Sequence, residues 1–177
     1  MSNISNMMIR APYDARAVAN LLLDTAAERG LDVTQLLLNK VIYFAHGWFL
    51  SRFNAPLIKQ EFEAWELGPV VKVLRDEFRQ FERRPITTRA FRLDILSGRR
   101  EIVEPHFSTE DKQFILDIFR SYYQYGAWKL SEMTHEKNSP WDKIWNSRSP
   151  IGRLALRIKN EEIKAHFDGL GGRLHLS

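Results

Sequence analysis

The sequence predicts a mainly α-helical fold, a compact single-domain helical bundle around a central buried helix, with a minor β-hairpin. Three observations lead to this prediction. Apolar residues recur three and four positions apart over most of the chain, as on the buried face of a helix. One of these stretches is apolar almost all round, which is typical of a helix covered on every side. Only the region near residues 87–104 shows the period-two pattern of a β-strand.

The first two helices are predicted from their capping residues. Asp14 is placed as the N-cap of the first helix, and Gly30 suits its end. Asp32, with Gln35 three residues later, forms a variant capping box for the second helix. This second helix, about residues 33–52, is the one expected at the centre of the fold.

Two elements are predicted between the central helix and the hairpin. Residues 62–64 form a short extended segment after a break in the helical pattern. Gly68-Pro69 is expected to begin a third helix, because proline at the first helical position sacrifices no hydrogen bond. Arg84-Pro85 ends that helix.

The remaining elements follow from local signals. Apolar and charged residues alternate over residues 91–95, and residues 102–103 suit the return strand of a hairpin. Further helices are expected after Ser108, over about Trp128–Thr134, after Ser139-Pro140, and from an N-cap at Asn160.

The composition suits one folded domain over residues 1–177, with flexible ends at residues 1–11 and 169–177. The chain is 44% hydrophobic and has 11 Phe and 5 Trp, enough for a substantial core. It has no cysteine, which excludes a disulfide, a zinc–thiolate site and a thiol nucleophile. The N-terminus does not resemble a signal peptide, and no stretch approaches the roughly 20 apolar residues of a membrane helix. We therefore expect a cytoplasmic protein without membrane contacts.

Positive charge is concentrated in one segment. Residues 72–100 carry nine Lys and Arg against four acidic residues, an excess of +5, whereas the whole chain has a net charge of +4. In the predicted third helix, four cations fall within roughly 80° of one side, since each residue advances the helix by about 100°. This pattern fits either a solvated face or a patch that binds an acidic partner. The candidate partner-binding residues are Lys72, Arg75, Arg79, Arg83, Arg84 and Arg89.

A nucleic acid is the less favoured partner for this segment. Its arginines could follow phosphates, but Asp76, Glu77 and Glu82 interrupt them, and no helix-turn-helix is evident.

Lys40 is the most informative single residue, because it lies inside an otherwise apolar helix. Its aliphatic stem could pack while the amine reaches water. Alternatively, the amine could hold a buried carboxylate or carbonyl near Glu66 or the turn at Gly68, because a buried amine needs an acceptor.

No local pattern indicates catalysis, a cofactor or a metal. The five histidines lack the spacing of a metal site, and no phosphate-binding glycine loop or nucleophile motif occurs. A lone histidine such as His135 is more often structural than catalytic. An enzyme that uses Lys40, Glu66 and His135 as a polar cluster is the remaining enzymatic alternative.

Three runs of residues resemble one known family. They are Leu38 to Phe44 (LNKVIYF), Ala64 to Val70 (AWELGPV) and Leu130 to Trp141 (LSEMTHEKNSPW). In this order they resemble the Panacea domain of SocA-like antitoxins, which also occurs in phage-associated GepA-like proteins. The resemblance makes the following residues family-motif positions: Asn39, Lys40, Tyr43, Phe44, Trp65, Glu66, Gly68, Pro69, Val70, Thr134, His135, Pro140 and Trp141.

The resemblance implies an antitoxin that binds and neutralises a cognate protein toxin without enzymatic activity. In such a protein, specificity is expected on the basic helix and the hairpin. One alternative is a proteolytic adaptor that delivers a toxin to the ClpXP protease, which would then be a second partner. Another is an accessory protein of a phage or mobile element that has no paired toxin.

Overall fold

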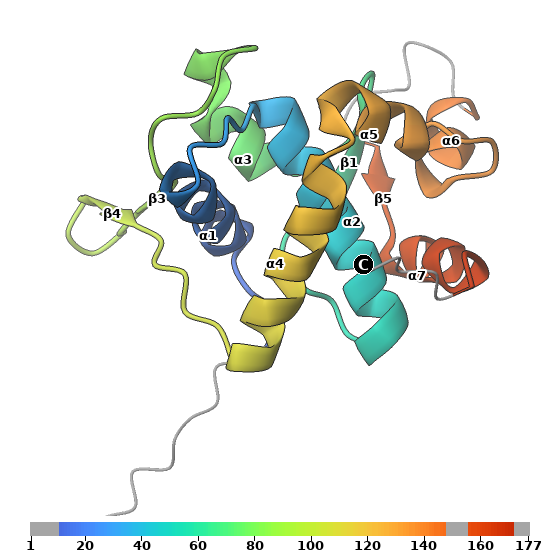
Figure 1. The fold of residues 1–177 in the computed structure, drawn as a ribbon, viewed down its shortest axis with the longest axis horizontal. Coiled ribbons are helices and arrows are strands. Elements are labelled where there is room, and N and C mark those ends of the chain that lie inside the picture. The colour runs from blue at the N-terminus through green and yellow to red at the C-terminus, as the bar shows by residue number, and fades with distance from the viewer. Residues whose placement is uncertain (1–10, 148–155, 172–177) are drawn as a thin grey trace, which may run out of the picture.

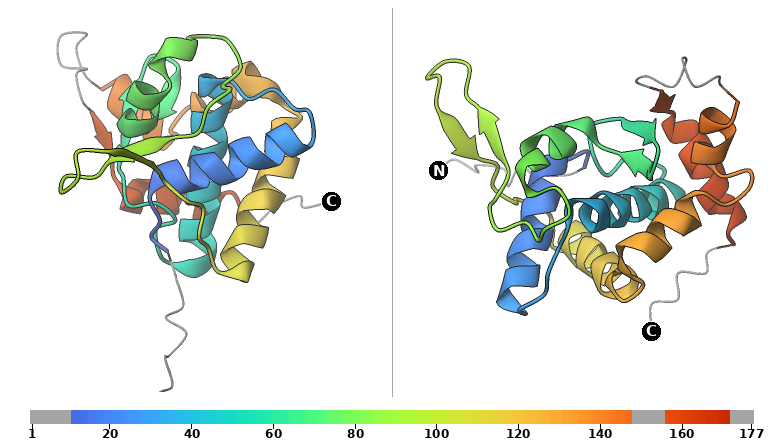
Figure 2. Two further views of the ribbon diagram at one scale, coloured as in Figure 1. Left: turned by 90° about the vertical axis from the view of Figure 1, so that its left-hand side faces the viewer. Right: turned by 90° about the horizontal axis from the view of Figure 1, so that it is seen from above.

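Helix α2 (Gln35–Phe53) is the centre of the fold, and the other elements surround it (Figures 1 and 2). The computed structural model describes residues 11–147 and 156–171. All side chains from Leu37 to Leu50 are buried, because α1, α4, α5 and α7 cover different sides of α2. The mainly α-helical prediction with a central buried helix is therefore confirmed. The other helices are α1 (Ala15–Glu28), α3 (Lys72–Glu77), α4 (Thr109–Tyr123), α5 (Gly126–Thr134), α6 (Pro140–Trp145) and α7 (Asn160–Gly169), with a 3₁₀ turn, η1 (Arg79–Phe81).

Three predicted helix starts are confirmed by their side-chain caps. Asp14 accepts a hydrogen bond from the backbone N–H of Arg16, at the start of α1. Ser108 and Ser139 cap α4 and α6 in the same way. Each cap satisfies one of the amide groups that have no partner within a helix.

Two predicted caps were wrong. Thr34, not Asp32, caps α2, with its hydroxyl accepting from the N–H of Leu37 at 3.3 Å. Asn160 lies inside α7, and its side chain pairs with His46 in place of capping the helix. In both cases, several residues nearby can cap a helix, and tertiary packing selects among them. The predicted flexible ends at residues 1–11 and 169–177 fall largely outside the described residues.

The predicted helix start at Gly68-Pro69 was also wrong. Strand β1 (Phe62–Trp65) turns back into β2 (Gly68–Val70), and Trp65 lies opposite Gly68. With β5 (Arg157–Ile158) on the other edge of β1, they form an antiparallel sheet in the order β2-β1-β5. The turn requires a positive φ at Gly68 (101°), which glycine adopts without steric cost. Helix α3 therefore begins only at Lys72.

The predicted hairpin is confirmed as β3 (Phe91–Leu93) paired with β4 (Arg100–Ile102). It projects from the body of the protein, as Figure 2 shows from above. Its base is attached to α1 by the buried side chain of Asn20. This amide donates to the carbonyls of Ala90 (3.0 Å) and Val103 (2.8 Å) and accepts from the N–H of Ala90.

Helix α7 packs closely on α2 at two adjacent residues. A Cβ at Gly47 would lie 2.2 Å from the ring of Phe167, so only glycine allows this approach. The ring of His46 is fully buried between Asn160, whose Oδ1 is 2.9 Å from Nε2, and the N–H of Ile58, which donates to Nδ1. His46 is therefore neutral, with Nε2 as the donor.

None of the helices in the described ranges is long and apolar enough to cross a bilayer.

We predict that His46 makes the protein sensitive to mild acid. Burial lowers the pKa of His46 from 6.5 to about 4, so between these values the unfolded chain binds more protons than the folded one. The neutral His46 therefore contributes its full share to the free energy of unfolding above pH 6.5. This share, roughly 3 kcal/mol, is lost as the pH falls towards 4. Urea unfolding of the wild type and His46→Gln between pH 4 and 7.5 measures the difference. A difference that does not change with pH would contradict the prediction.

Candidate functional site

The side chain of Lys40 is fully buried and binds the backbone of the β1–β2 turn. Its Nζ donates to the carbonyl of Pro69 at 2.8 Å. The amine does not reach water, so the second of the two interpretations of Lys40 describes the structure. Burial lowers the pKa of Lys40 from 10.5 to about 7, because the charged amine loses its hydration there.

Asn39, the neighbour of Lys40, holds the next residues of the same segment. Its Oδ1 accepts from the N–H of Val71 at 2.9 Å, and its Nδ2 donates to the carbonyl of Gln35 at 3.0 Å. The polar pair in the first half of α2 therefore binds one carbonyl in β2 and the amide that follows β2.

Helices α5 and α6 hold the turn from the other side. The hydroxyl of Ser131 donates to the carbonyl of Leu67 at 2.8 Å, and Nε1 of Trp141 donates to the carbonyl of Trp65 at 2.7 Å. We call the four side chains that bind the backbone of residues 65–71 the turn clamp: Asn39, Lys40, Ser131 and Trp141.

Gly68 lies at the centre of the turn clamp. A Cβ at this position would meet Thr134 Oγ1 at 2.4 Å and Lys40 Nζ at 2.9 Å. The position therefore needs glycine both for its positive φ and for the close approach of two side chains. The hydroxyl of Thr134 itself donates back to the carbonyl of Ser131 (2.7 Å), and the hydroxyl of Ser139 donates to the carbonyl of Thr134 (2.8 Å).

The structure therefore brings together motif residues from all three runs around one turn. Ser131 was not singled out from the sequence, and Ser139 was predicted only as a helix start, although both lie in the third run. A signal was available for Ser131, because it is three residues before Thr134 on the same side of α5. Tyr43 and Phe44 are core residues instead, packed against Phe62, Phe167 and Tyr122.

The polar cluster of the enzymatic alternative does not assemble around a common point. His135 stacks on Trp141 with 3.8 Å between ring centroids, and its Nε2 is buried without a hydrogen-bond partner among the described residues. Burial and the nearby charge of Lys40 both lower the pKa of His135. Glu66 is exposed on the outside of the turn and makes no hydrogen bond with either residue. No group of three or more potential metal ligands occurs among the described residues.

Four of the six candidate partner-binding cations, Lys72, Arg75, Arg79 and Arg83, were predicted to share one side of a helix, but α3 ends at Glu77 and η1 follows. Most of the six have intramolecular partners. Lys72 pairs with Asp76, Arg75 lies over the ring of Trp65 (5.0 Å), Arg84 donates to the carbonyl of Gln80, and Arg89 pairs with Asp24. Arg79 and Arg83 are exposed and have no acidic partner in the described part of the chain.

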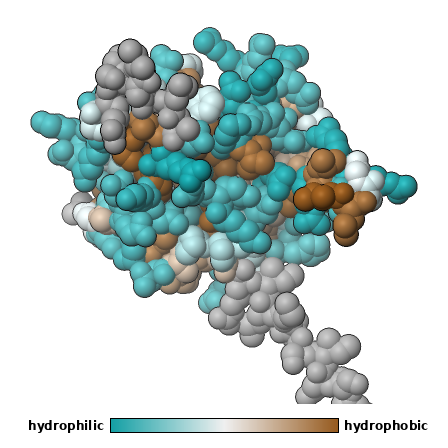
Figure 3. All heavy atoms as spheres, turned by 180° about the vertical axis from the view of Figure 1, so that it is seen from behind, coloured by the Kyte–Doolittle hydropathy of each residue, from teal (hydrophilic) through white to brown (hydrophobic). Residues whose placement is uncertain are grey.

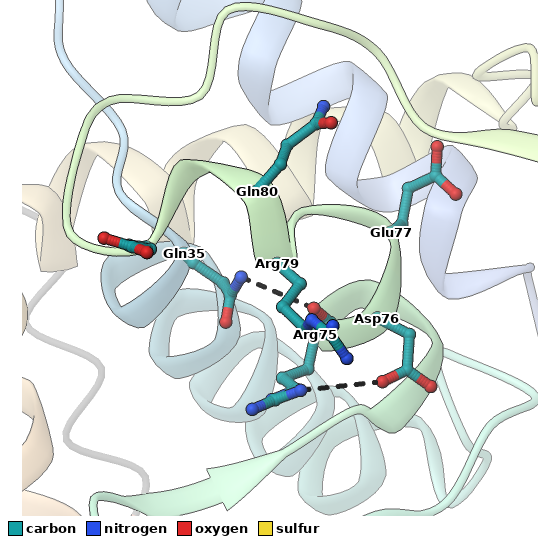
Figure 4. Close-up of a pocket in the computed structure, with 7 residues that line it drawn as sticks. Gln35, Arg75, Asp76, Glu77, Arg79 and Gln80 are labelled. Carbon is teal, nitrogen blue, oxygen red and sulfur yellow. Dashed lines mark hydrogen bonds and ion pairs between the residues drawn. The ribbon is translucent and has the colours of Figure 1, made fainter.

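Arg75 lines two of the depressions beside this segment. Figure 4 shows the first, a polar space of about 680 Å³ that Arg75 and Arg79 both line. Gln35 Nε2 donates to the carbonyl of Arg75 there, at 3.4 Å.

The second depression, of about 500 Å³, is mainly apolar, and we call it the Trp65–Trp128 groove. It is lined by Thr34, Gln35, Leu36, Asn39, Trp65, Glu66, Leu67, Val70, Arg75, Glu82, Arg83, Ala127 and Trp128. Trp128 is 60% exposed, so it does not belong to the core that the aromatic content predicts. The sequence around Trp128 looks like that of a core tryptophan. Its exposure is set by how α5 packs beside the β1–β2 turn, which the local sequence does not specify.

We predict that the stability cost of burying Lys40 depends on pH. Because the folded pKa of about 7 is below the unfolded value of 10.5, the unfolded chain binds more protons between these values. Raising the pH through this window should stabilise the wild type relative to Lys40→Met, on the order of 4 kcal/mol. The measurement is denaturant unfolding of both proteins from pH 6.5 to 10.5. If their difference stays constant, Lys40 keeps its charge in the folded protein.

Comparisons with known proteins agree with the geometry of the motif. The family described as "Antitoxin SocA-like, Panacea domain" matches residues 38–142, which include the whole turn clamp. Antitoxin SocA of Caulobacter vibrioides (strain NA1000 / CB15N) is 40% identical over 154 residues, which cover 87% of this chain and 82% of the relative. No solved structure matches the chain. The family match and this identity over most of both chains show that the chain belongs to the SocA-like antitoxin family with a Panacea domain.

Proposed function

We propose that this chain is an antitoxin that binds a cognate protein toxin directly and neutralises it without chemistry. The observation that carries this proposal is the 40% identity to Antitoxin SocA over most of both chains. The candidate site supports binding over catalysis. Its polar side chains hold a backbone turn by hydrogen bonds. Lys40, whose amine has a strongly lowered pKa, is buried and cannot contact a substrate.

The proposed contact surface combines the basic segment after α3 with the projecting hairpin. Arg79 and Arg83 are exposed and unpaired within the described chain. The hairpin carries Leu93, Ile95 and Leu96 with most of their surface in water, the last two being 91% and 98% exposed. Hydrophobic surface is visible on this projection in Figure 3, which views the protein from behind. Exposed apolar side chains beside cations are typical of a protein-binding surface.

Co-expression with the product of the adjacent reading frame tests the proposed function. We expect that product alone to arrest growth, and this chain to restore growth and to co-purify with the product in a fixed ratio. A harmless neighbour that does not co-purify would contradict the antitoxin proposal.

The proteolytic-adaptor alternative predicts a different result in cells without ClpXP. Direct neutralisation persists there, because occupancy of the toxin by this chain is sufficient. Rescue that disappears with the protease, together with restored toxin levels, would favour the adaptor mechanism.

We predict that reversing two unpaired cations slows association with the toxin. Arg79→Glu with Arg83→Glu should lower the association rate by about tenfold or more at low salt and reduce its salt dependence, because the steering charge is lost. The matched control is Lys112→Glu with Lys137→Glu, which changes the net charge equally at exposed positions on α4 and after α5. Surface-immobilised binding at two salt concentrations measures both. Equal effects of the two double variants would exclude a local role for Arg79 and Arg83.

A further inference from the structure

We infer that the Trp65–Trp128 groove is the docking site for a short segment of the toxin that carries apolar side chains and an adjacent carboxylate. This inference rests on the proposed function and adds the chemistry of the bound segment. It concerns a different surface from the hairpin, since the groove lies between the start of α2, the β1–β2 turn and the start of α5.

The wall of the groove is held rigidly by the turn clamp. The carbonyls of Trp65 and Leu67 are bound from behind by Trp141 and Ser131, so the side chain of Leu67 is left on the outer face. Asn39 contributes to the clamp and to the lining of the groove. A surface that is already ordered loses little conformational entropy on binding, and this favours affinity.

The groove leaves large apolar side chains in water. Trp128 is 60% exposed and Leu67 is 40% exposed, and the two face the same depression. At about 500 Å³, the space falls within the roughly 300–1,000 Å³ of typical binding pockets. Tryptophan is also one of the residues enriched among the anchors that dominate interface energies. These features fit one or two apolar side chains of a partner.

The arginines at the rim of the groove favour a toxin segment that carries a carboxylate next to its apolar side chains. Arg83 lines the groove without an acidic partner in the described residues, and Arg79 lies on the adjacent depression. Two nearby carboxylates are already in ion pairs, Asp76 with Lys72 and Glu77 with Arg100. Within the groove itself, Arg75 and Arg83 balance Glu66 and Glu82, so the excess positive charge comes from Arg79 on the adjacent depression. A carboxylate on the toxin segment would pair with Arg83.

The absence of cysteine in the chain allows a direct test of occupancy. Leu67→Cys places a single thiol in the groove, and Leu170→Cys places one at the end of α7, where the native side chain is also 40% exposed. The rate of maleimide labelling is measured with and without the purified product of the adjacent reading frame. We expect that product to slow labelling at position 67 by about tenfold or more and to leave position 170 unchanged.

A second pair of variants measures the energetic contribution. Trp128→Ala should weaken the Kd by about 30-fold or more, as expected for a tryptophan anchor. Tyr125→Ala is the matched control, because Tyr125 is 50% exposed beside α5 but does not line the groove. Far-UV circular dichroism and thermal unfolding verify that both variants fold like the wild type.

The outcomes separate this inference from the proposed function. If the wild type binds the product but position 67 stays reactive and Trp128→Ala binds like Tyr125→Ala, the groove is not the docking site and the antitoxin function stands. If the wild type does not bind the product at all, the proposed function fails first. Protection at position 67 that rises with the concentration of this chain alone would show that a second copy fills the groove, which also overturns the inference.

Discussion

The hydrogen bond from Lys40 to the carbonyl of Pro69 is the contact on which the arrangement of the site depends. An amine without water is costly to bury, and one carbonyl compensates only part of that cost. The bond is possible only because Gly68 lets the backbone approach α2 closely. Any change that moves the turn outward would leave both the amine and the carbonyl without their partner.

The turn clamp connects the core of the protein with its surface. Its members bind the carbonyls and amides of residues 65–71 from the inside, which orders the backbone of the turn. The same residues present Leu67 and Glu66 to the outside, on one wall of the Trp65–Trp128 groove. Most of the family-motif residues at this turn therefore hold the backbone in place, and the groove side chains lie around them.

The distribution of charge shows why a net excess is an incomplete guide to a binding surface. Residues 72–100 have an excess of +5, but much of it is neutralised or held within the molecule. Arg89 connects the hairpin base to Asp24 and Glu104, and Arg100 pairs with Glu77. Arg79 and Arg83 are among the cations that have no acidic partner in the described part of the chain, and Arg83 lines the same groove as the exposed Trp128.

The sequence by itself determined the helical class, the central buried helix, the hairpin and several helix starts. These follow from local hydrophobic periodicity and from caps such as Asp14 and Ser108, which act over a few residues. Only the tertiary structure decided that Gly68-Pro69 belongs to a strand, that Lys40 binds a carbonyl, and that Trp128 is exposed. The turn at Gly68-Pro69 is bound by Asn39, Lys40, Ser131 and Trp141, which all lie at least 29 residues away from the backbone groups that they bind. Local propensity cannot specify such contacts, because the energy that selects them arises only when the distant segments meet.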